Sequence, residues 1–191
     1  MTARIVLASA SPRRRELLDQ IKVGYIVNPI DLDETPLTDE APIDYVQRLA
    51  AEKSAACVRQ LGDKLPVLAA DTAVVLGDQI MGKPKDRDDA FAMLRQLSGK
   101  MHRVYTAISL RGDVHYQAVS ITEVTFKTLT DDDIEAYWLS QEPIDKAGSY
   151  AIQGIGSIFV QSINGSFSGV VGLPLFETAE LLSKLGIGIF K

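Results

Sequence analysis

Three consecutive arginines follow two serines near the N-terminus, in an arrangement that could bind a polyanion. Arg13, Arg14 and Arg15 come just after Ser9 and Ser11 and after a short apolar segment. The pattern predicts a strand, a turn and a helix with Ser11 as its N-cap. The first turn of a helix normally favours acidic residues, so three cations there indicate a bound anion. Backbone N–H groups, hydroxyls and guanidinium groups together bind phosphate well. The alternative is that these arginines lie on an exposed, solvated helix face.

A carboxylate interrupts the most apolar segment of the chain. Residues 67–76 (VLAADTAVVL) are otherwise apolar or small, which predicts a central strand that contains Asp71. A carboxylate buried in a strand is unfavourable unless it is paired or bound to a metal ion. Asp71 is therefore a candidate functional residue, unless the strand ends at Ala70 and Asp71 belongs to a turn.

A lysine lies on the apolar stripe of the helix predicted over residues 42–61. Lys53 is three residues after Ala50 and four before Cys57, so it shares their face. It could extend its ammonium to solvent. Together with Asp71 and the arginine turn, however, it would suit a triphosphate held with a divalent metal ion.

Two weaker signals point to the same chemistry. Lys83 and Lys85 flank a proline after the hairpin turn predicted at residues 77–78. Glu34 ends an acidic run that could supply an oxygen ligand for Mg²⁺ or Mn²⁺, although acidic loops are more often only solvated. His102 and His115 lack ligand spacing, so neither a zinc site nor a histidine-based triad is indicated.

Strand and helix patterns alternate along the chain, which predicts an α/β or α+β fold. The dipeptide Asn164-Gly165 predicts a further turn. The expected strands cover residues 5–8, 25–27, 67–76, about 102–110, 114–126 and 157–162. The expected helices cover residues 12–20, 42–61, about 87–98, a segment capped by Thr130, and about 174–185.

Composition limits the class of protein. The 191 residues, 46% hydrophobic and 24% charged, fit one globular domain spanning residues 1–191. A formal net charge of −5 argues against a nucleic acid partner. The N-terminal apolar stretch is too short for a signal peptide or a membrane span, so we expect a soluble, cytoplasmic protein with no membrane partner. The single cysteine, Cys57, excludes an internal disulfide and is expected to be a buried, inert thiol.

Six segments, in order along nearly the whole chain, resemble the Maf family of nucleoside triphosphate pyrophosphatases. They are LASASPRRRELL, YVQRLAAEKSAA, LAADTAVVLGDQIMGKPKD, LSGKMHRVYTAI, DKAGSYAIQGIG and NGSFSGVVGLPLFET. The resemblance implies a two-lobed α/β fold related to inosine triphosphatases, with a mixed sheet, flanking helices and a nucleotide cleft between the lobes. It also implies a homodimer, a divalent cation, and cleavage of a nucleoside triphosphate between the α and β phosphates.

The resemblance assigns roles to the residues singled out above. Asp71 matches the family's proton acceptor and, with Glu34, the metal site. Lys85 stands where close relatives carry arginine, and a lysine lacks the forked guanidinium. The residues that match substrate-binding positions are Ser9, Ser11, Arg13, Arg14, Lys53, Lys83 and Lys85.

Three further matches imply substrate preference. Arg13, Thr72 and Gln153 resemble the branch that prefers dTTP and UTP, not the branch that prefers 7-methyl-GTP. The amide of Gln153 can match the carbonyl and imide edge of uracil or thymine. Two other functions stay open at this point: a nucleotide-sensing regulator of cell division with little turnover, and a nucleotidyltransferase.

Overall fold

Seven strands form one mixed sheet in the computed structural model, which describes residues 2–62 and 64–190. The strand order is β2-β1-β3-β5-β6-β7, with β4 also paired to β3. Strands β2, β1 and β3 are parallel, and the other pairs are antiparallel. The strands are β1 Ile5–Leu7, β2 Tyr25–Val27, β3 Val67–Leu76, β4 Gln79–Met81, β5 Met101–Arg111, β6 His115–Phe126 and β7 Val160–Asn164.

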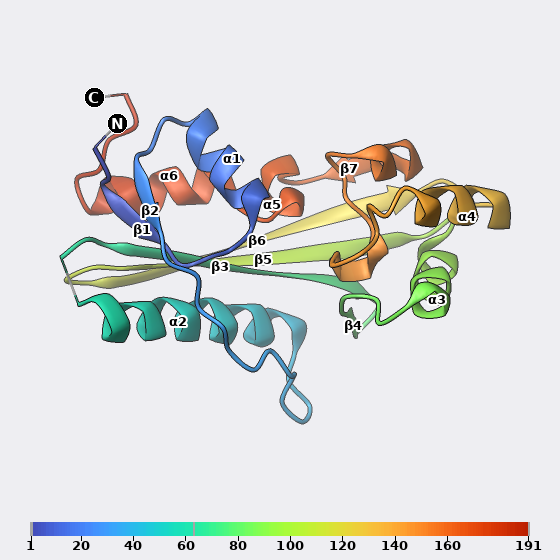
Figure 1. Ribbon diagram of the computed structural model, residues 1–191, viewed down its shortest axis with the longest axis horizontal. Helices are drawn as coiled ribbons and strands as arrows, with labels where there is room; N and C mark the ends of the chain where they lie inside the picture. The colour runs from blue at the N-terminus through green and yellow to red at the C-terminus, as the bar shows by residue number, and fades with distance from the viewer. Residues whose placement is uncertain (1, 63, 191) are drawn as a thin grey trace.

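Helices cover both faces of this sheet (Figure 1). Helix α2 lies along one face, whereas α1, α5 and α6 lie on the other, and α3 and α4 gather at the far end of β3, β5 and β6. None of the helices in the described part of the chain is long and apolar enough to cross a membrane. The helices are α1 Pro12–Gln20, α2 Pro42–Leu61, α3 Arg87–Leu97, α4 Asp131–Leu139, α5 Phe167–Val171 and α6 Leu175–Lys184, with 3₁₀ helices η1 Ala147–Ser149 and η2 Ile155–Phe159.

The long strands β3, β5 and β6 join two lobes (Figure 1). The first lobe contains β1, β2, α1, α2 and α6, and the second contains β4, α3, α4, β7 and the 3₁₀ helices. The expected mixed sheet with flanking helices is therefore confirmed.

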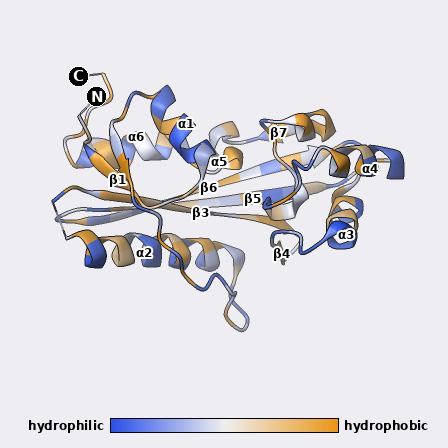
Figure 2. Ribbon diagram, in the orientation of Figure 1, coloured by the Kyte–Doolittle hydropathy of each residue, from blue (hydrophilic) through white to orange (hydrophobic). Residues whose placement is uncertain are grey.

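Strand β3 carries two apolar faces, as a central strand should. Leu68, Ala70 and Val74 belong to the main core, whereas Val67, Ala69, Ala73 and Val75 belong to the two clusters that contain α2 residues. Helix α2 turns its apolar stripe toward the sheet and its polar side outward (Figure 2). The apolar pattern of residues 67–76 thus results from burial on both sides of the strand.

Most predicted elements begin and end within a residue of the observed ones, but two predictions fail. The strand expected over residues 157–162 is instead η2 followed by β7. Gly156 and Phe159 are buried while Ser157 and Ile158 are exposed, so burial follows a three-residue period and not an alternation. Helix α5 was not predicted, because five residues are too few to show a helical period.

Candidate active site

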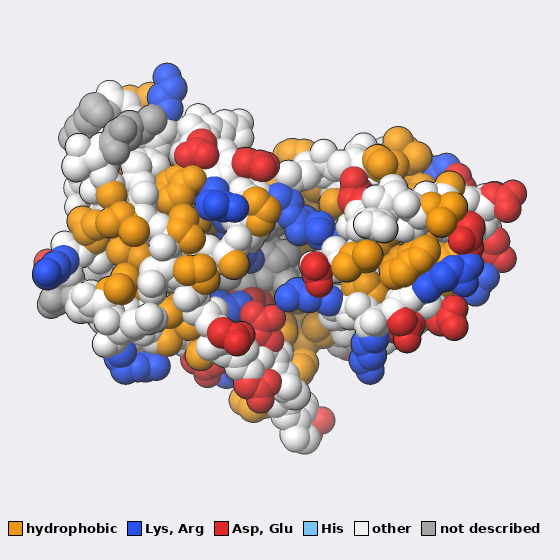
Figure 3. All heavy atoms as spheres, in the orientation of Figure 1, with side chains coloured by type: hydrophobic (Ala, Val, Ile, Leu, Met, Phe, Trp, Pro, Cys, Tyr) orange, Lys and Arg blue, Asp and Glu red, His pale blue; other side chains and the backbone are white. Residues whose placement is uncertain are grey.

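A cavity of about 550 Å³ lies between the two lobes. Ser9, Arg14 and Lys53 line it from the first lobe, and Lys83 and Lys146 line it from the second. In the space-filling view, basic and acidic side chains gather where the surface is hollowed between the lobes (Figure 3). The lobes therefore enclose a charged cavity at the place where the sequence predicts a cleft.

The free edge of β3 forms the floor of this cavity. Within the described residues, β1 pairs with β3 only at Val67 and Leu68, and β4 pairs with it only from Val74 onward. Residues 69–73 are left without a partner strand on this side. Asp71 and Thr72 lie in this stretch and both line the cavity. Because adjacent strand residues point to opposite faces, they present their side chains on the two sides of the sheet.

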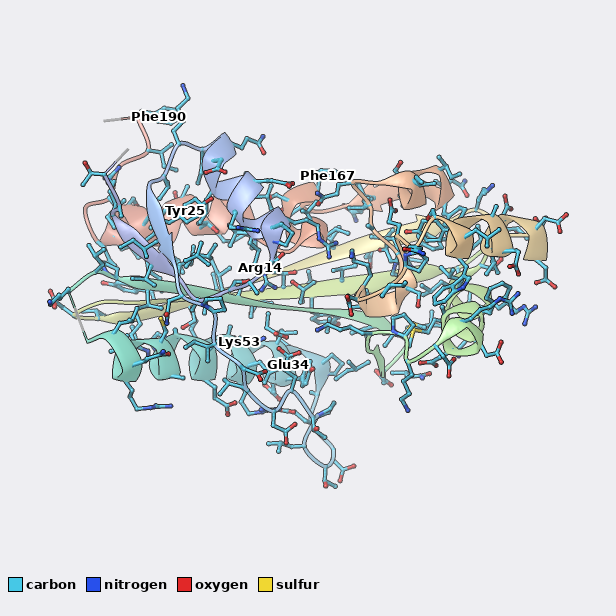
Figure 4. The ribbon with its side chains drawn as sticks, in the orientation of Figure 1. Arg14, Tyr25, Glu34, Lys53, Phe167 and Phe190 are labelled. Carbon is cyan, nitrogen blue, oxygen red and sulfur yellow. The ribbon has the colours of Figure 1, made fainter. Side chains whose placement is uncertain are left out.

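Lys53 joins two carboxylates beside this floor. Its ammonium donates to Asp71 Oδ1 at 2.6 Å and to Glu34 Oε1 at 2.5 Å. Lys53 and Asp71 are buried, whereas Glu34 is about half exposed. Figure 4 shows Lys53 on α2 and Glu34 on the loop before it close together on one side of β3, with Arg14 on the other. Lys53, Asp71 and Glu34, which are far apart in the sequence, thus form one charged cluster.

The cluster shifts the pKa values of its two carboxyls in opposite directions. Burial raises the pKa of Asp71, although the charges of Lys53 and Arg14 oppose the rise. Burial also acts to raise the pKa of Glu34, but its hydrogen bond and attraction to Lys53 outweigh it and leave that pKa lowered. Asp71 is therefore the better proton acceptor of the two.

The loop before α2 holds Glu34 in place. The hydroxyl of Tyr45 donates to the backbone carbonyl of Glu34 at 2.9 Å. The guanidinium of Arg48 donates to both oxygens of Glu40, at 2.6 and 2.7 Å, and to the carbonyl of Thr35. Two residues of α2 therefore fix the loop that presents Glu34 to Lys53.

Arg14 connects the start of α1 to the floor of the cavity. Its guanidinium donates to Gly172 O at 2.7 Å, Ser9 Oγ at 3.1 Å and Thr72 Oγ1 at 3.2 Å. Burial lowers the pKa of Arg14, and the nearby carboxylate of Asp71 opposes this shift. The arginine turn and Asp71 therefore share one cavity, as the sequence predicts.

The serines of this turn are arranged differently from the expected cap. Ser9 Oγ accepts from the backbone N–H of Ser11 at 3.2 Å. Ser11 occupies the N-cap position, but among the described residues its side chain makes no capping hydrogen bond. The predicted N-cap position of Ser11 is therefore confirmed, but it is Ser9 Oγ, and not the Ser11 side chain, that binds a backbone N–H at this turn. Both serines line the cavity.

Arg13, Lys83 and Lys146 bring further positive charge to the cavity. Burial lowers the pKa of Lys146, and the charges of Arg13 and Lys83 lower it further. Burial also lowers the pKa of Arg13, against the attraction of Tyr137, Glu142 and Glu16. Crowded, partly desolvated cations of this kind favour a bound polyanion.

Two predicted site residues lie outside the cavity lining. Lys85 is exposed, and its backbone N–H donates to Asp89 at 3.0 Å. Gln153 is also exposed, and its amide donates to Glu16 of α1 at 3.3 Å. Neither belongs to the described residues that line the cavity, although Gln153 directly follows Ala151 and Ile152, which do. The sequence pattern does not specify where the side chains at these two positions lie.

The carboxylates of Asp71 and Glu34 suit a divalent metal ion. Across residues 2–62 and 64–190 there is no cluster of three or more acidic, histidine or cysteine ligands. Mg²⁺, however, commonly binds one or two carboxylates and takes its other ligands from substrate phosphates and water. The two carboxylates already converge on one cation, the Lys53 ammonium, so the donor set fits this arrangement.

Three polar residues that line the cavity are not predicted from the sequence: Asp145, Lys146 and Tyr150. All three belong to the DKAGSY segment, which contributed to the family resemblance but gave no side chain a role. Here η1 contains Gly148 at φ 67°, so no helical or strand period places these residues. The only local signal was a lysine beside small residues and glycine.

The chain matches known proteins over almost its full length. The family described as Maf-like protein matches residues 4–185. A dTTP/UTP pyrophosphatase of Methylococcus capsulatus is 52% identical, over 97% of this chain and 92% of that protein. A dTTP/UTP pyrophosphatase of Shewanella oneidensis is 53% identical, over 96% of this chain and 98% of that protein. Among solved structures, the Ham1 protein of Staphylococcus aureus has 19% sequence identity and a TM-score of 0.48, over 64% of this chain and 71% of that chain.

Proposed function

The chain belongs to the Maf family, and we propose that it is a nucleoside triphosphate pyrophosphatase that hydrolyses dTTP and UTP to the monophosphate and pyrophosphate. Relatives about half identical to it carry the name dTTP/UTP pyrophosphatase, which supports this substrate class over 7-methyl-GTP. The observation that carries the proposal is the position of Lys53 between Asp71 and Glu34, in the cavity that Arg14 and Ser9 also line.

Asp71 takes a proton from the water that attacks the α phosphorus. One of its oxygens, Oδ1, is held by Lys53, and we assign the proton to the other oxygen. The raised pKa of Asp71 makes it a stronger base than an exposed carboxylate. The hydrogen bond from Lys53 holds this carboxylate in a fixed orientation at the floor of the cavity.

Arginine and lysine side chains bind the triphosphate and offset the charge on the leaving pyrophosphate. Ser9, Ser11 and Arg14 supply donors at the start of α1, where the helix dipole also favours an anion. Arg13, Lys83 and Lys146 supply positive charge nearby. Most of the rate enhancement then comes from electrostatic stabilisation of the transition state.

Asp71 and Glu34 would hold a divalent cation, Mg²⁺ or Mn²⁺, which would supply Lewis-acid neutralisation of phosphate charge. Base selection falls to Arg13, Thr72 and Gln153. Gln153 directly follows Ala151 and Ile152, which line the cavity. Its amide therefore lies beside the cavity, where it can contact a base at the cavity mouth. An amide offers both a donor and an acceptor to uracil or thymine.

Product analysis tests the proposal. Purified protein is mixed with dTTP, UTP, CTP, GTP or 7-methyl-GTP and with Mg²⁺ or Mn²⁺, and monophosphate and pyrophosphate are measured. We expect equal amounts of both products, fastest from dTTP and UTP. A nucleotide sensor would leave the triphosphate intact, and a nucleotidyltransferase would release no monophosphate without an acceptor. Either result would overturn the proposal.

We also propose that the protein is a cytoplasmic homodimer. Resemblance to the Maf family supports the dimer, and the acidic, cysteine-poor composition is compatible with the cytoplasm. Analytical ultracentrifugation tests the oligomeric state, and a monomer at micromolar concentration would contradict it.

A further inference from the structure

Glu142 and Tyr137 hold the backbone on both sides of Gln153. Glu142 accepts from the backbone N–H groups of Ile155 and Gly156, both at 2.9 Å. The hydroxyl of Tyr137 donates to Glu142 at 2.7 Å and accepts from the backbone N–H of Ala151 at 3.1 Å. Two side chains of one lobe thus fix three backbone groups of a single loop, residues 151–156.

These contacts rest on a rigid base. Tyr137 is buried on α4, and its ring packs edge-on against Phe159 with the centroids 4.9 Å apart. Burial acts to raise the pKa of Glu142, but hydrogen bonds from Gly156, Tyr137 and Ile155 outweigh it and leave the pKa lowered. Glu142 therefore stays ionised at neutral pH and accepts all three hydrogen bonds.

The glycines of the loop are required by this close approach. A Cβ at Gly154 would lie 2.1 Å from Glu142 Oε2, and a Cβ at Gly156 would lie 2.6 Å from the hydroxyl of Tyr137. Gly154 has φ −113°, which other residues adopt freely, so backbone strain does not explain it. The glycines at 154 and 156 are explained by the lack of space for a side chain beside Glu142 and Tyr137.

The loop also joins the cavity to the predicted specificity positions. Ala151 and Ile152 line the cavity, and Gln153 reaches across to Glu16 on α1. We propose that Glu142 and Tyr137 are positioning residues that set base selectivity by fixing the 151–156 loop and, with it, Gln153. This inference rests on the proposed function, because it takes Gln153 as the group that recognises the pyrimidine base.

The variants Glu142→Gln and Tyr137→Phe test the proposal, with Glu180→Gln on the exposed side of α6 as the matched control. An amide at position 142 would face the N–H of Ile155, and phenylalanine at 137 removes the partner of Ala151. We expect kcat/KM for dTTP and UTP to fall about 10- to 100-fold, mainly through KM, because a misplaced base-binding group loses contacts that are made equally to the bound substrate and to the transition state. Selectivity over dCTP and CTP should shrink, whereas the control keeps both values. Unchanged selectivity with a lower melting temperature would mean a structural role only and would overturn the proposal.

A double-substitution cycle separates positioning from general damage. As a single substitution, Gly154→Ala should reduce selectivity, because its methyl group would collide with Glu142. In a Glu142→Ala background the collision is gone, so adding Gly154→Ala should change selectivity little. Equal effects of Gly154→Ala in both backgrounds would contradict the inferred clamp.

Binding measurements distinguish failure of this inference from failure of the proposed function. The dissociation constants of dTTP and dCTP are measured without metal, for the unaltered protein and each variant. If the unaltered protein prefers dTTP but forms no monophosphate, the proposed catalysis is wrong. The inference is then decided by binding alone, and it holds only if Glu142→Gln and Tyr137→Phe reduce the preference for dTTP. Hydrolysis of dTTP with no loss of binding preference in Glu142→Gln and Tyr137→Phe would overturn the inference alone. Equal binding of dTTP and dCTP by the unaltered protein would also overturn it.

Discussion

Lys53 and Asp71 lie opposite each other between two apolar clusters under α2, joined by a 2.6 Å hydrogen bond. Cys57 packs in the cluster on one side of the pair and Ala50 in the cluster on the other. Replacing a buried ion pair by apolar residues often leaves a protein equally stable or more stable. The stability of the fold therefore does not explain why Lys53 and Asp71 are present here. A role in catalysis explains why charge occupies the middle of an otherwise apolar contact.

Asp71→Asn tests the assigned base. Asparagine keeps the size of the side chain and an acceptor for Lys53 but cannot take a proton from water, so kcat for dTTP should fall about 10²- to 10⁴-fold. In the unaltered protein, kcat should fall as the pH drops through the raised pKa of Asp71, because the base must be deprotonated. Steady-state kinetics across pH measures both. Asp78→Asn, in the exposed turn after β3, is the control, and an Asp71→Asn variant as active as this control would refute the assignment.

Arg14→Lys tests whether the three contacts of Arg14 position the phosphate-binding turn. One ammonium cannot reproduce a guanidinium that donates to Gly172, Ser9 and Thr72 at once. We expect kcat/KM for dTTP to fall about 10- to 100-fold. Arg15→Lys, on the exposed side of α1, should change it little. Equal kinetics for the two variants would argue against a positioning role for Arg14.

Lys83→Ala and Lys85→Ala should have different effects on KM, although both lysines match substrate-binding positions in the sequence. Both lysines are exposed, but only Lys83 is among the described residues that line the cavity. Losing a charge beside the triphosphate should raise KM for dTTP about tenfold or more for Lys83→Ala, since a charged hydrogen bond is worth about 1.5–3 kcal/mol. Lys85→Ala should stay near the original value in the same assay. The reverse order would show that the loop moves on binding.

The sequence singles out Lys53, Asp71 and the arginines at the start of α1 because each breaks a regular pattern. Lys53 interrupts an apolar helix stripe and Asp71 an apolar strand, and each pattern is long enough to make the exception visible. Lys146 and Tyr150 flank the three-residue 3₁₀ helix η1, where there is no such pattern. Their place in the cavity depends on how the second lobe packs, which local sequence does not encode.

Lys85 and Gln153 illustrate a different limit. The family resemblance gives each a position in the chain, but the direction of a loop side chain depends on tertiary contacts. For Gln153 these are the hydrogen bonds of Glu142 and Tyr137 to the surrounding loop. The predicted hairpin turn at residues 77–78 agrees with the pairing of β3 and β4, but the short pairing with β1, which leaves residues 69–73 without a partner strand on that side, is not visible in the strand pattern.

His102 should make stability depend on pH independently of catalysis. It is buried against Tyr150, whose hydroxyl is 2.8 Å from Nε2, and burial lowers the pKa of His102 from 6.5 to about 4. Between these values the unfolded chain binds a proton that the folded chain does not, so stability falls as the pH drops. The free energy of unfolding should lose about 3 kcal/mol from this group between neutral pH and about pH 4.

Urea unfolding at several pH values measures this contribution. His102→Gln removes the titrating group and keeps a hydrogen-bonding partner for Tyr150, so its stability should vary less with pH than that of the unaltered protein. His115→Gln, at an exposed position, should retain most of the dependence. Parallel curves for the unaltered protein and His102→Gln would contradict the prediction.

Hydrolysis of dTTP in ¹⁸O-labelled water tests the central claim most directly, because it reports which phosphorus the water attacks. With Asp71 activating water against the α phosphorus, one ¹⁸O atom should appear in the monophosphate and none in the pyrophosphate, as read by mass spectrometry. Label in the pyrophosphate, or release of labelled inorganic phosphate and a nucleoside diphosphate, would place the attack on another phosphorus and contradict the proposed reaction.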